Sequence, residues 1–198
     1  MATRGRPRSF DRALALQRAM DVFWAKGYEG AQLTDLTAAM GINPPSFYAA
    51  FGCKEAIFRE AVDHYEATVG FRTVRALQKT GTAREVMVAM LTESVDTALA
   101  APGHGGCLFI VGIVSCAKEN EPLRRHLEGF RRTTVARIRR RLDRAVSEGD
   151  LSADADTRGL AIFFGTMIQG LSLQARDGAS RKDLLRVVAA AASVLPGG

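Results

Sequence analysis

Apolar residues recur three and four positions apart in every long segment of the 198-residue chain, and this spacing constrains the fold more than any other feature. The alternation of apolar and polar residues that is typical of β-strands is nearly absent from the sequence. Hydrophobic residues make up 47% of the chain and charged residues 24%, a balance that excludes a disordered chain and allows a buried core. We therefore expect an all-α fold.

Glycine, proline and capping residues divide the chain into helical segments. Asp11 is a suitable N-cap for the first helix and Gly27 a suitable stop, while Pro122 and Gly149 bracket an arginine-rich helix. The expected helices span residues 11–27, 32–40, 44–51, 54–79, 83–100, 106–118, 122–148, 155–177 and 181–194.

Residues 33–51 have the pattern of a helix-turn-helix, in which two short helices meet at a tight turn. Gly41 permits the left-handed backbone of that turn, Ile42 fills the gap between the helices, and Phe47 anchors the second helix. The N-terminal end of the second helix, which enters the DNA major groove in such motifs, is left exposed. Short helix pairs joined by a glycine turn also occur in unrelated bundles, so this segment alone leaves both interpretations open.

Motifs within this segment and on both sides of it resemble those of a known family. The sequence FWAKGY at 23–28 closes the first helix, LTDL at 33–36 opens the second, and SFYAAFGCKEAIF occupies 46–58. Spread over residues 8–62 in fixed order, these motifs resemble the DNA-binding domain of the TetR (tetracycline-repressor-like) family of bacterial transcription regulators. The rest of the chain has the length and helical content of that family's ligand-binding and dimerisation domain.

Three residues depart from the family's pattern. Gln32 and Cys53 stand where the family usually has helix-capping residues, and Thr37 stands where alanine is common at a tight helix crossing. Losing a cap typically costs about 0.5–2 kcal/mol. We therefore expect these departures to affect local stability and phosphate contact, and not the fold.

The resemblance implies a division into a basic arm at 1–9, a helix-turn-helix DNA-binding domain at 10–53 and an effector-binding and dimerisation domain at 54–198. It also implies that Tyr48 and Lys54 contact DNA phosphates, for which a phenol donor and an ammonium at a helix N-terminus are suited. Thr34 is a further phosphate candidate, and base reading falls to the start of the second short helix. The expected DNA-binding residues are Arg4, Arg6, Arg8, Thr34, Pro44, Pro45, Ser46, Tyr48 and Lys54.

The arginines of the arm alternate with flexible or extended residues, as in arms that follow a phosphate backbone or enter a narrow minor groove. A solvated chain end is an alternative interpretation of the same residues. The net charge of +6 says little by itself about DNA. Between Arg124 and Arg144, nine arginines outnumber two carboxylates by seven, which leaves the rest of the chain at −1.

The C-terminal two thirds suggest an apolar effector pocket and a dimer interface. A small hydrophobic or amphipathic effector is expected at Cys107, Phe109, Ile110, Phe163 and Met167, although the same residues suit a solid core. More apolar surface occurs on the last two helices than one protomer needs, and the family dimerises through these helices. The expected homodimer interface consists of Leu160, Phe164, Ile168, Leu171, Leu184 and Val188.

The sequence gives little support for catalysis, a cofactor or a membrane span. No catalytic triad, paired carboxylate or metal signature occurs in it, and its longest apolar run, 107–117, is too short to cross a bilayer. His104, Cys107 and Cys116 suggest a metal or redox sensor, against the simpler interpretation of reduced, buried cysteines. We expect a cytoplasmic, dimeric, ligand-responsive repressor that binds double-stranded operator DNA and has no metal or cofactor. The alternatives are a ligand-insensitive architectural protein and an enzyme with an incidental helix pair.

Overall fold

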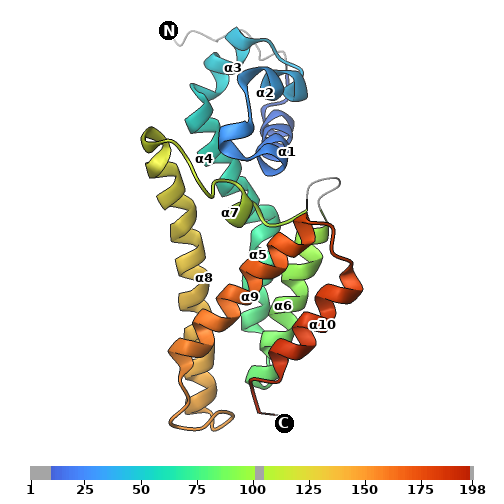
Figure 1. Cartoon of the computed structure of the whole chain (residues 1–198). Coiled ribbons are helices and arrows are strands. Elements are labelled where there is room, and N and C mark those ends of the chain that lie inside the picture. The colour runs from blue at the N-terminus through green and yellow to red at the C-terminus, as the bar shows by residue number, and fades with distance from the viewer. Residues whose placement is uncertain (1–9, 101–104, 197–198) are drawn as a thin grey trace.

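The computed structural model describes residues 10–100 and 105–196, and over these ranges it contains helices and no strand (Figure 1). This confirms the all-α prediction. The helices are α1 (Arg12–Gly30), α2 (Leu33–Met40), α3 (Pro44–Phe51), α4 (Lys54–Tyr65), α5 (Phe71–Arg75), α6 (Ala83–Leu99), α7 (Leu108–Val111), α8 (Glu121–Ser147), α9 (Thr157–Arg176) and α10 (Arg181–Ala192). In the described residues, no helix is long and apolar enough to span a bilayer.

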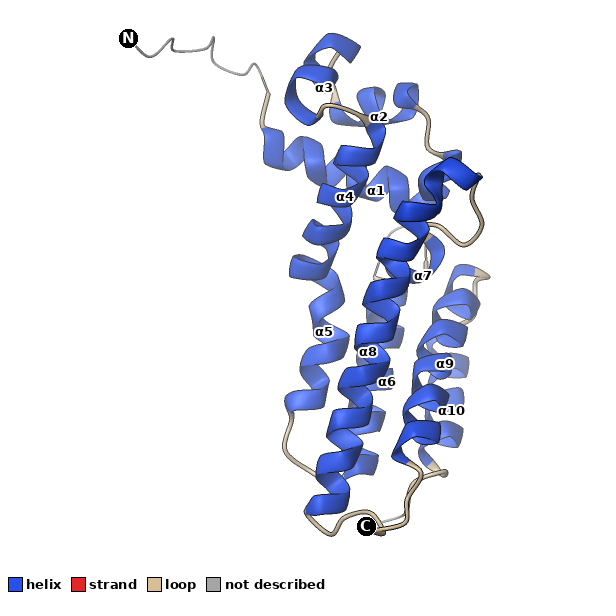
Figure 2. Ribbon diagram, turned by 90° about the vertical axis from the view of Figure 1, so that its left-hand side faces the viewer, coloured by secondary structure: helices blue, strands red, loops and turns tan. Residues whose placement is uncertain are grey.

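The molecule is elongated, with α1, α2 and α3 gathered at one end and the long helices of the remaining chain running away from them (Figure 2). We call residues 10–61 the head, and residues 62–100 together with 105–196 the body. The first half of α4 packs on α1 and contributes Ile57 and Phe58 to the head's core. Packing is therefore continuous across residue 53, where the sequence predicted a functional boundary.

The head has an aromatic core. Phe23, Phe47 and Phe58 are completely buried, and the Phe23 and Phe58 rings meet edge to face with centroids 5.0 Å apart. Tyr28 packs against Phe58 with a centroid distance of 4.9 Å. Such aromatic pairs have preferred orientations, so they restrict the angles at which α1, α3 and α4 can cross.

Caps are retained at two helix starts where the sequence predicted their loss. The Gln32 backbone N–H donates to the Asp35 carboxylate over 3.0 Å at the start of α2, and the Cys53 sulfur accepts from the Ala56 N–H over 3.4 Å at the start of α4. Thr37, buried at the α1–α2 crossing, donates its hydroxyl to the Leu33 carbonyl over 2.9 Å. The departures from the family pattern thus leave these backbone and hydroxyl groups with partners.

The expected helix at 54–79 is present but irregular. Between α4 and α5 lies a π-helical turn at Glu66–Gly70, and after α5 the chain tightens into a 3₁₀ turn at Ala76–Gln78. A Cβ on Gly70 would lie only 2.9 Å from the Phe109 ring, so glycine allows that ring to approach the helix.

The helix expected at 106–118 is wrong in extent, because only α7 forms a single turn there. Gly105 and Gly106 precede it with positive φ angles of 55° and 83°, and the chain after Val111 turns away from the helix. We call residues 105–117 the connecting segment, since it runs between the head and the body. Its backbone groups find partners on other elements, which replaces the hydrogen bonds that a longer helix would supply.

The body has a mainly aliphatic core, built where α9 packs on α6 and α8. Met87, Met90, Leu91 and Phe164 are completely buried in it. α10 covers α6 from the outer side and completes this core with Leu184 and Val188.

Candidate nucleic-acid interface and ligand pocket

The start of α3 is held in place by a cap that the sequence analysis overlooked. The Asn43 side chain accepts from the Ser46 backbone N–H over 2.9 Å, and Pro44 and Pro45 fill the first turn, where no N–H partner exists. An Asn before two prolines is a recognisable helix-start signal. Phe47 anchors the opposite side of the helix in the head's core, so the first turn of α3 projects from the protein.

The predicted DNA-contacting residues of the helix-turn-helix lie on the surface. Thr34, Pro44 and Pro45 are exposed, and Ser46 is half-buried. Tyr48 is 54% exposed although its ring packs edge to face on buried Phe47, with centroids 5.5 Å apart. Its phenol can therefore reach a partner outside the protein while Phe47 restricts the motion of the ring. Arg4, Arg6 and Arg8 lie outside the described residues.

Lys54 occupies the first position of α4 and lies on an aromatic ring. Its Nζ atom is 4.5 Å from the centroid of the Tyr28 ring, within the range of a cation–π interaction. Burial lowers the pKa of Lys54, and the Glu29 carboxylate opposes that shift. An anion bound at the N-terminus of α4 would stabilise the charged ammonium, as a DNA phosphate would do.

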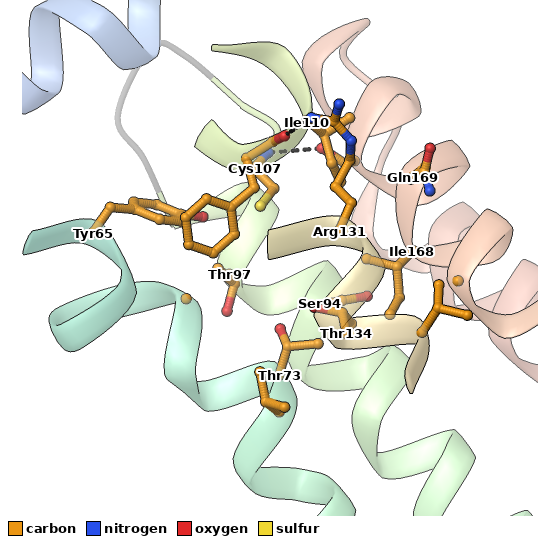
Figure 3. A pocket seen from close by; sticks show the side chains of 16 residues that line it. Tyr65, Thr73, Ser94, Thr97, Cys107, Ile110, Arg131, Thr134, Ile168 and Gln169 are labelled. Atoms are coloured by element: carbon orange, nitrogen blue, oxygen red, sulfur yellow. Dashed lines mark hydrogen bonds between the residues drawn. The ribbon is translucent and has the colours of Figure 1, made fainter. Parts of the chain in front are cut away.

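A small cavity lies in the body just below the head, enclosed by α4 to α6, the connecting segment, α8 and α9 (Figure 3). Its volume is about 50 Å³. Phe109 and Ile110 form apolar walls, and the Phe109 ring stacks on Phe130 with a centroid distance of 4.6 Å. From α9 the lining residues are Gly165, Ile168, Gln169 and Ser172.

Several polar side chains also line this cavity, and two of them lack a hydrogen bond of good geometry. The Thr97 Oγ1 atom is buried without a hydrogen-bond partner among the described residues, and the buried Tyr65 hydroxyl lies beside the Cys107 thiol without a hydrogen bond of good geometry. Burial raises the pKa of Tyr65 and also raises that of the Cys107 thiol beside it, so both groups are neutral near pH 7. Arg131 donates to the Phe109 carbonyl, and burial lowers its pKa. An apolar wall with unused hydroxyls is typical of a site for a small, weakly polar ligand.

Two of the five residues predicted to line an effector pocket do not line the cavity. Cys107, Phe109 and Ile110 line the cavity, whereas Phe163 and Met167 lie outside its lining and pack against the body's core. Helical spacing identifies the apolar faces of α9 but does not say which of them borders the cavity. The sequence analysis also missed Tyr65, Thr97 and Arg131, whose signal is a polar residue within an otherwise apolar helical face.

The connecting segment joins this cavity to the head. Near Cys107, the Gly106 carbonyl accepts from the Trp24 indole N–H over 2.8 Å, and the Gly112 carbonyl accepts from the Tyr28 backbone N–H over 2.7 Å. Gly27, at the break in α1, has a φ of 68°, and a Cβ there would lie 3.2 Å from the Gly112 oxygen. The end of α1 therefore lies directly against the segment that supplies Cys107, Phe109 and Ile110 to the cavity.

Four of the predicted interface residues are wrong for a dimer contact. Phe164, Leu171, Leu184 and Val188 are at most 3% exposed and pack within the protomer's own core. Leu160 and Ile168 are half-buried, and Ile168 lines the cavity. The large apolar side chains that α9 and α10 present to solvent are Ile162, Leu173 and Val187.

The metal or redox interpretation finds no cluster to support it in the residues that the structure describes. His104 lies outside them, and within them no group of three or more potential His, Cys, Asp or Glu ligands is placed to hold a metal. Cys107 and Cys116 are free thiols.

Comparison with known proteins connects this geometry to a family. Residues 15–61 match the model of bacterial regulatory proteins of the tetR family, and residues 81–191 match the tetracyclin repressor-like C-terminal domain. The transcriptional repressor ComR of Escherichia coli is 29% identical over 93% of this chain and 89% of its own length.

Solved structures agree with the family models. A cysteine-substituted mutant of the TetR family regulator CifR, complexed with 26-bp double-stranded operator DNA, superposes with a TM-score of 0.91 and 44% identity, covering 96% of this chain and 100% of that one. A TetR regulator from Rhodococcus sp. RHA1 has 36% identity and a TM-score of 0.61, covering 95% of this chain and 100% of its own. This chain belongs to the TetR family and is a DNA-binding transcriptional regulator.

Proposed function

We propose that this regulator is a repressor that binds a pseudo-palindromic operator as a homodimer and releases it when a small molecule enters the cavity. The observation that carries the proposal is the connecting segment, which lines the cavity and also hydrogen-bonds to the end of α1 through Trp24 and Tyr28. The protein acts in this proposal by binding alone, in the cytoplasm, without catalysing a reaction.

On DNA, the first turn of α3 enters the major groove. Pro44, Pro45 and Ser46 face the bases there, and the prolines contribute apolar contact and shape because they have no N–H to donate. Tyr48 and Lys54 bind phosphates on either side of the groove, with Thr34 as a further phosphate contact. The arm residues Arg4, Arg6 and Arg8 follow the backbone or enter the adjacent minor groove.

The effector in this proposal is small, mainly apolar and uncharged, and carries a hydrogen-bond acceptor. The acceptor receives hydrogen bonds from the Tyr65 and Thr97 hydroxyls, neither of which has a hydrogen bond of good geometry in the described residues. Because the cavity of about 50 Å³ is far below the volume of most ligand sites, the walls have to move apart on binding. Phe109 and Ile110 are the wall residues whose movement would reach the head, since they belong to the connecting segment.

Such movement regulates DNA binding only if the effector prefers a conformation whose two heads do not fit the operator. Couplings of this kind are typically worth about 1–3 kcal/mol. The dimer forms through the exposed faces of α9 and α10, and two heads related by a two-fold axis read half-sites about 34 Å apart. The names of the relatives ComR and BdcR, both repressors, and the operator DNA bound to CifR support a repressor that acts on an operator.

Substitution of Lys54 and Tyr48 tests the DNA interface. We expect Lys54→Ala and Tyr48→Ala to weaken binding to operator and to random DNA by similar factors, since phosphate contacts carry no sequence information, and Lys54→Ala to reduce the salt slope by about one. Lys182→Ala is the matched control, because it removes the same charge from exposed α10. Fluorescence anisotropy at several salt concentrations measures these effects. If the Lys54→Ala variant bound DNA with the same affinity as wild type, Lys54 would not be a DNA contact.

A compound screen separates the proposal from its alternatives. Compounds that stabilise the native protein in a thermal shift assay are expected to include some that also lower operator affinity. If every stabilising compound leaves operator affinity unchanged, a ligand-insensitive DNA-binding protein becomes the better explanation. Turnover of a stabilising compound would instead favour an enzyme.

A further inference from the structure

A second hollow, which we call the arginine groove, lies on the body between α5 and α8 and is adjacent to the cavity, with which it shares Val74 as a lining residue. Its volume is about 670 Å³. The charged residues that line it are Glu66, Arg75, Arg137, Arg140, Arg141 and Arg144. Five arginines thus face one hollow that contains a single carboxylate.

Arg141 is the most unusual of these residues because its charged side chain is buried. It is only 4% exposed, and one guanidinium nitrogen donates to the Gly81 carbonyl over 2.5 Å. Its Nε and Nη1 atoms have no hydrogen-bond partner among the described residues. A buried cation with unused donors is unfavourable unless something supplies negative charge and acceptors.

The protein itself supplies little negative charge here. Arg144 pairs with Glu148 over 3.0 Å, but among the described residues no carboxylate forms an ion pair with Arg75, Arg137 or Arg140. Elsewhere on α8 the pattern differs, since Arg139 pairs with Asp143 and Arg132 with Glu128. Arg137 and Arg140, which have no ion pair among the described residues, both face the groove.

We propose that the arginine groove binds a small molecule that carries a phosphate group. Arginine donors match phosphate oxygens in pairs, and the volume of the groove lies in the range of small-molecule sites. Phe71, Val74 and Leu77 also line it and provide an apolar wall for the rest of the ligand. The site is distinct from the cavity, whose lining contains one arginine and several neutral hydroxyls.

The position of the groove favours a small molecule over DNA. α5 and α8 run away from α3, and the groove residues of α8 lie in its half farther from the head (Figure 2). DNA bound in the major-groove arrangement at α3 would contact the head. A concave, partly apolar groove also suits a compact ligand better than an extended phosphate backbone.

Calorimetric titration of the DNA-free, full-length protein with sodium pyrophosphate tests this site. We expect saturable binding to wild type and an increase in Kd of about tenfold for Arg137→Gln and for Arg140→Gln, since each removes one charge-assisted contact. Arg139→Gln is the matched control, because it removes the same charge from a neighbouring position that pairs with Asp143 outside the groove. Its Kd should stay within about twofold of wild type.

A second variant tests the buried cation. Arg141→Met removes the charge while keeping an apolar side chain in the core, and we expect it to abolish pyrophosphate binding while circular dichroism shows a folded protein. Inorganic sulfate at the same ionic strength distinguishes a phosphate site from general attraction to anions. Absence of saturable binding to wild type, equal losses for Arg139→Gln and Arg140→Gln, or unchanged binding by Arg141→Met would each overturn the proposal.

Discussion

The head and the body differ in how completely their buried polar side chains are hydrogen-bonded. In the head, every buried side-chain nitrogen or oxygen of the described residues has a partner, as the Thr37 hydroxyl and the Trp24 indole illustrate. In the body, atoms of Tyr65, Thr97, His126 and Arg141 are buried without one. An unsatisfied buried group costs about 1–3 kcal/mol, so the body carries a cost that the head avoids.

This difference in hydrogen bonding agrees with a different role for each region. The head has to present α3 at one angle, and its aromatic pairs and satisfied hydrogen bonds favour a single packing. Of the body's unpartnered residues, Tyr65 and Thr97 line the cavity and Arg141 lines the groove, where a ligand can supply the missing acceptors, whereas His126 lines neither. We infer that the head is built for one geometry and the body for more than one.

The largest effect is expected from opening the aromatic core of the head. Phe47→Ala should lower the free energy of unfolding by about 3–5 kcal/mol and abolish operator binding, because Phe47 is fully buried and anchors α3. Phe164→Ala should cost a similar amount in the body. Urea unfolding measures both. If Phe47→Ala lost less than 1 kcal/mol, the head would be more adaptable than its packing indicates.

A smaller effect is expected at the exposed face of α9 and α10. Leu173→Asp should weaken the dimer by about 2 kcal/mol or more and reduce operator affinity while the protomer stays folded, because this side chain is 52% exposed. Light scattering with circular dichroism checks both properties. Lys182→Asp, an exposed change on α10, serves as a control for added negative charge. A wild-type protein that is monomeric at micromolar concentration, free and on DNA, would contradict the dimer.

Two threonine substitutions compare head and body directly. Thr37→Val should destabilise the protein by about 0.5–1.5 kcal/mol, since it removes a satisfied hydrogen bond. Thr97→Val should be neutral or stabilising, since the hydroxyl that it removes has no partner in the described residues. Thermal unfolding measures this contrast, and equal losses at both positions would remove the distinction between the regions. Thr97→Val should also weaken any effector that depends on this hydroxyl.

The smallest expected effect concerns acid stability. A hydrogen bond from Lys26, followed by one from the Gln32 backbone, lowers the pKa of Asp35 in the head, and hydrogen bonds from Arg124 and Arg125 lower that of Glu121 in the body to about 2. A folded-state pKa below the unfolded value gives stability that is present above the unfolded pKa and lost as pH falls through the folded one. Asp35→Asn and Glu121→Gln should each flatten the loss of stability below about pH 4. Urea midpoints at several acidic pH values measure the slope, and a slope unchanged by both variants would assign acid sensitivity to other groups.

The sequence predicted the helices best where punctuation and amphipathic pattern agree. Gly41 and Gly52 end α2 and α3 with positive φ angles of 69° and 77°, as their positions suggested. The exposed first turn of α3 followed from the same pattern, because Phe47 and Phe51 share the buried side and Tyr48 does not. At these positions the neighbouring residues alone were sufficient to predict where a helix ends and which side of it is exposed.

Prediction failed where a residue's environment depends on distant parts of the chain. The connecting segment is apolar on all sides, yet Trp24, Tyr28 and Ser172 bind its backbone and limit α7 to one turn. α9 is apolar on more than one face, so its spacing could not distinguish buried Phe164 from exposed Ile162. Tyr65 of α4 and Thr97 of α6 line one cavity only in the assembled body, so the sequence pattern of either helix does not reveal the site.

The hydrogen bond from the Tyr28 amide to the Gly112 carbonyl makes this amide a local probe of motion between head and body. A buried amide proton exchanges with solvent only when its hydrogen bond opens, and the exchange rate reports the free energy of that opening. If the head separates from the connecting segment without unfolding, the Tyr28 proton will exchange sooner than amides in the centre of α1, such as that of Met20. Residue-resolved exchange in heavy water could therefore time the separation, on a scale of minutes to hours that crystallographic displacement parameters do not sample.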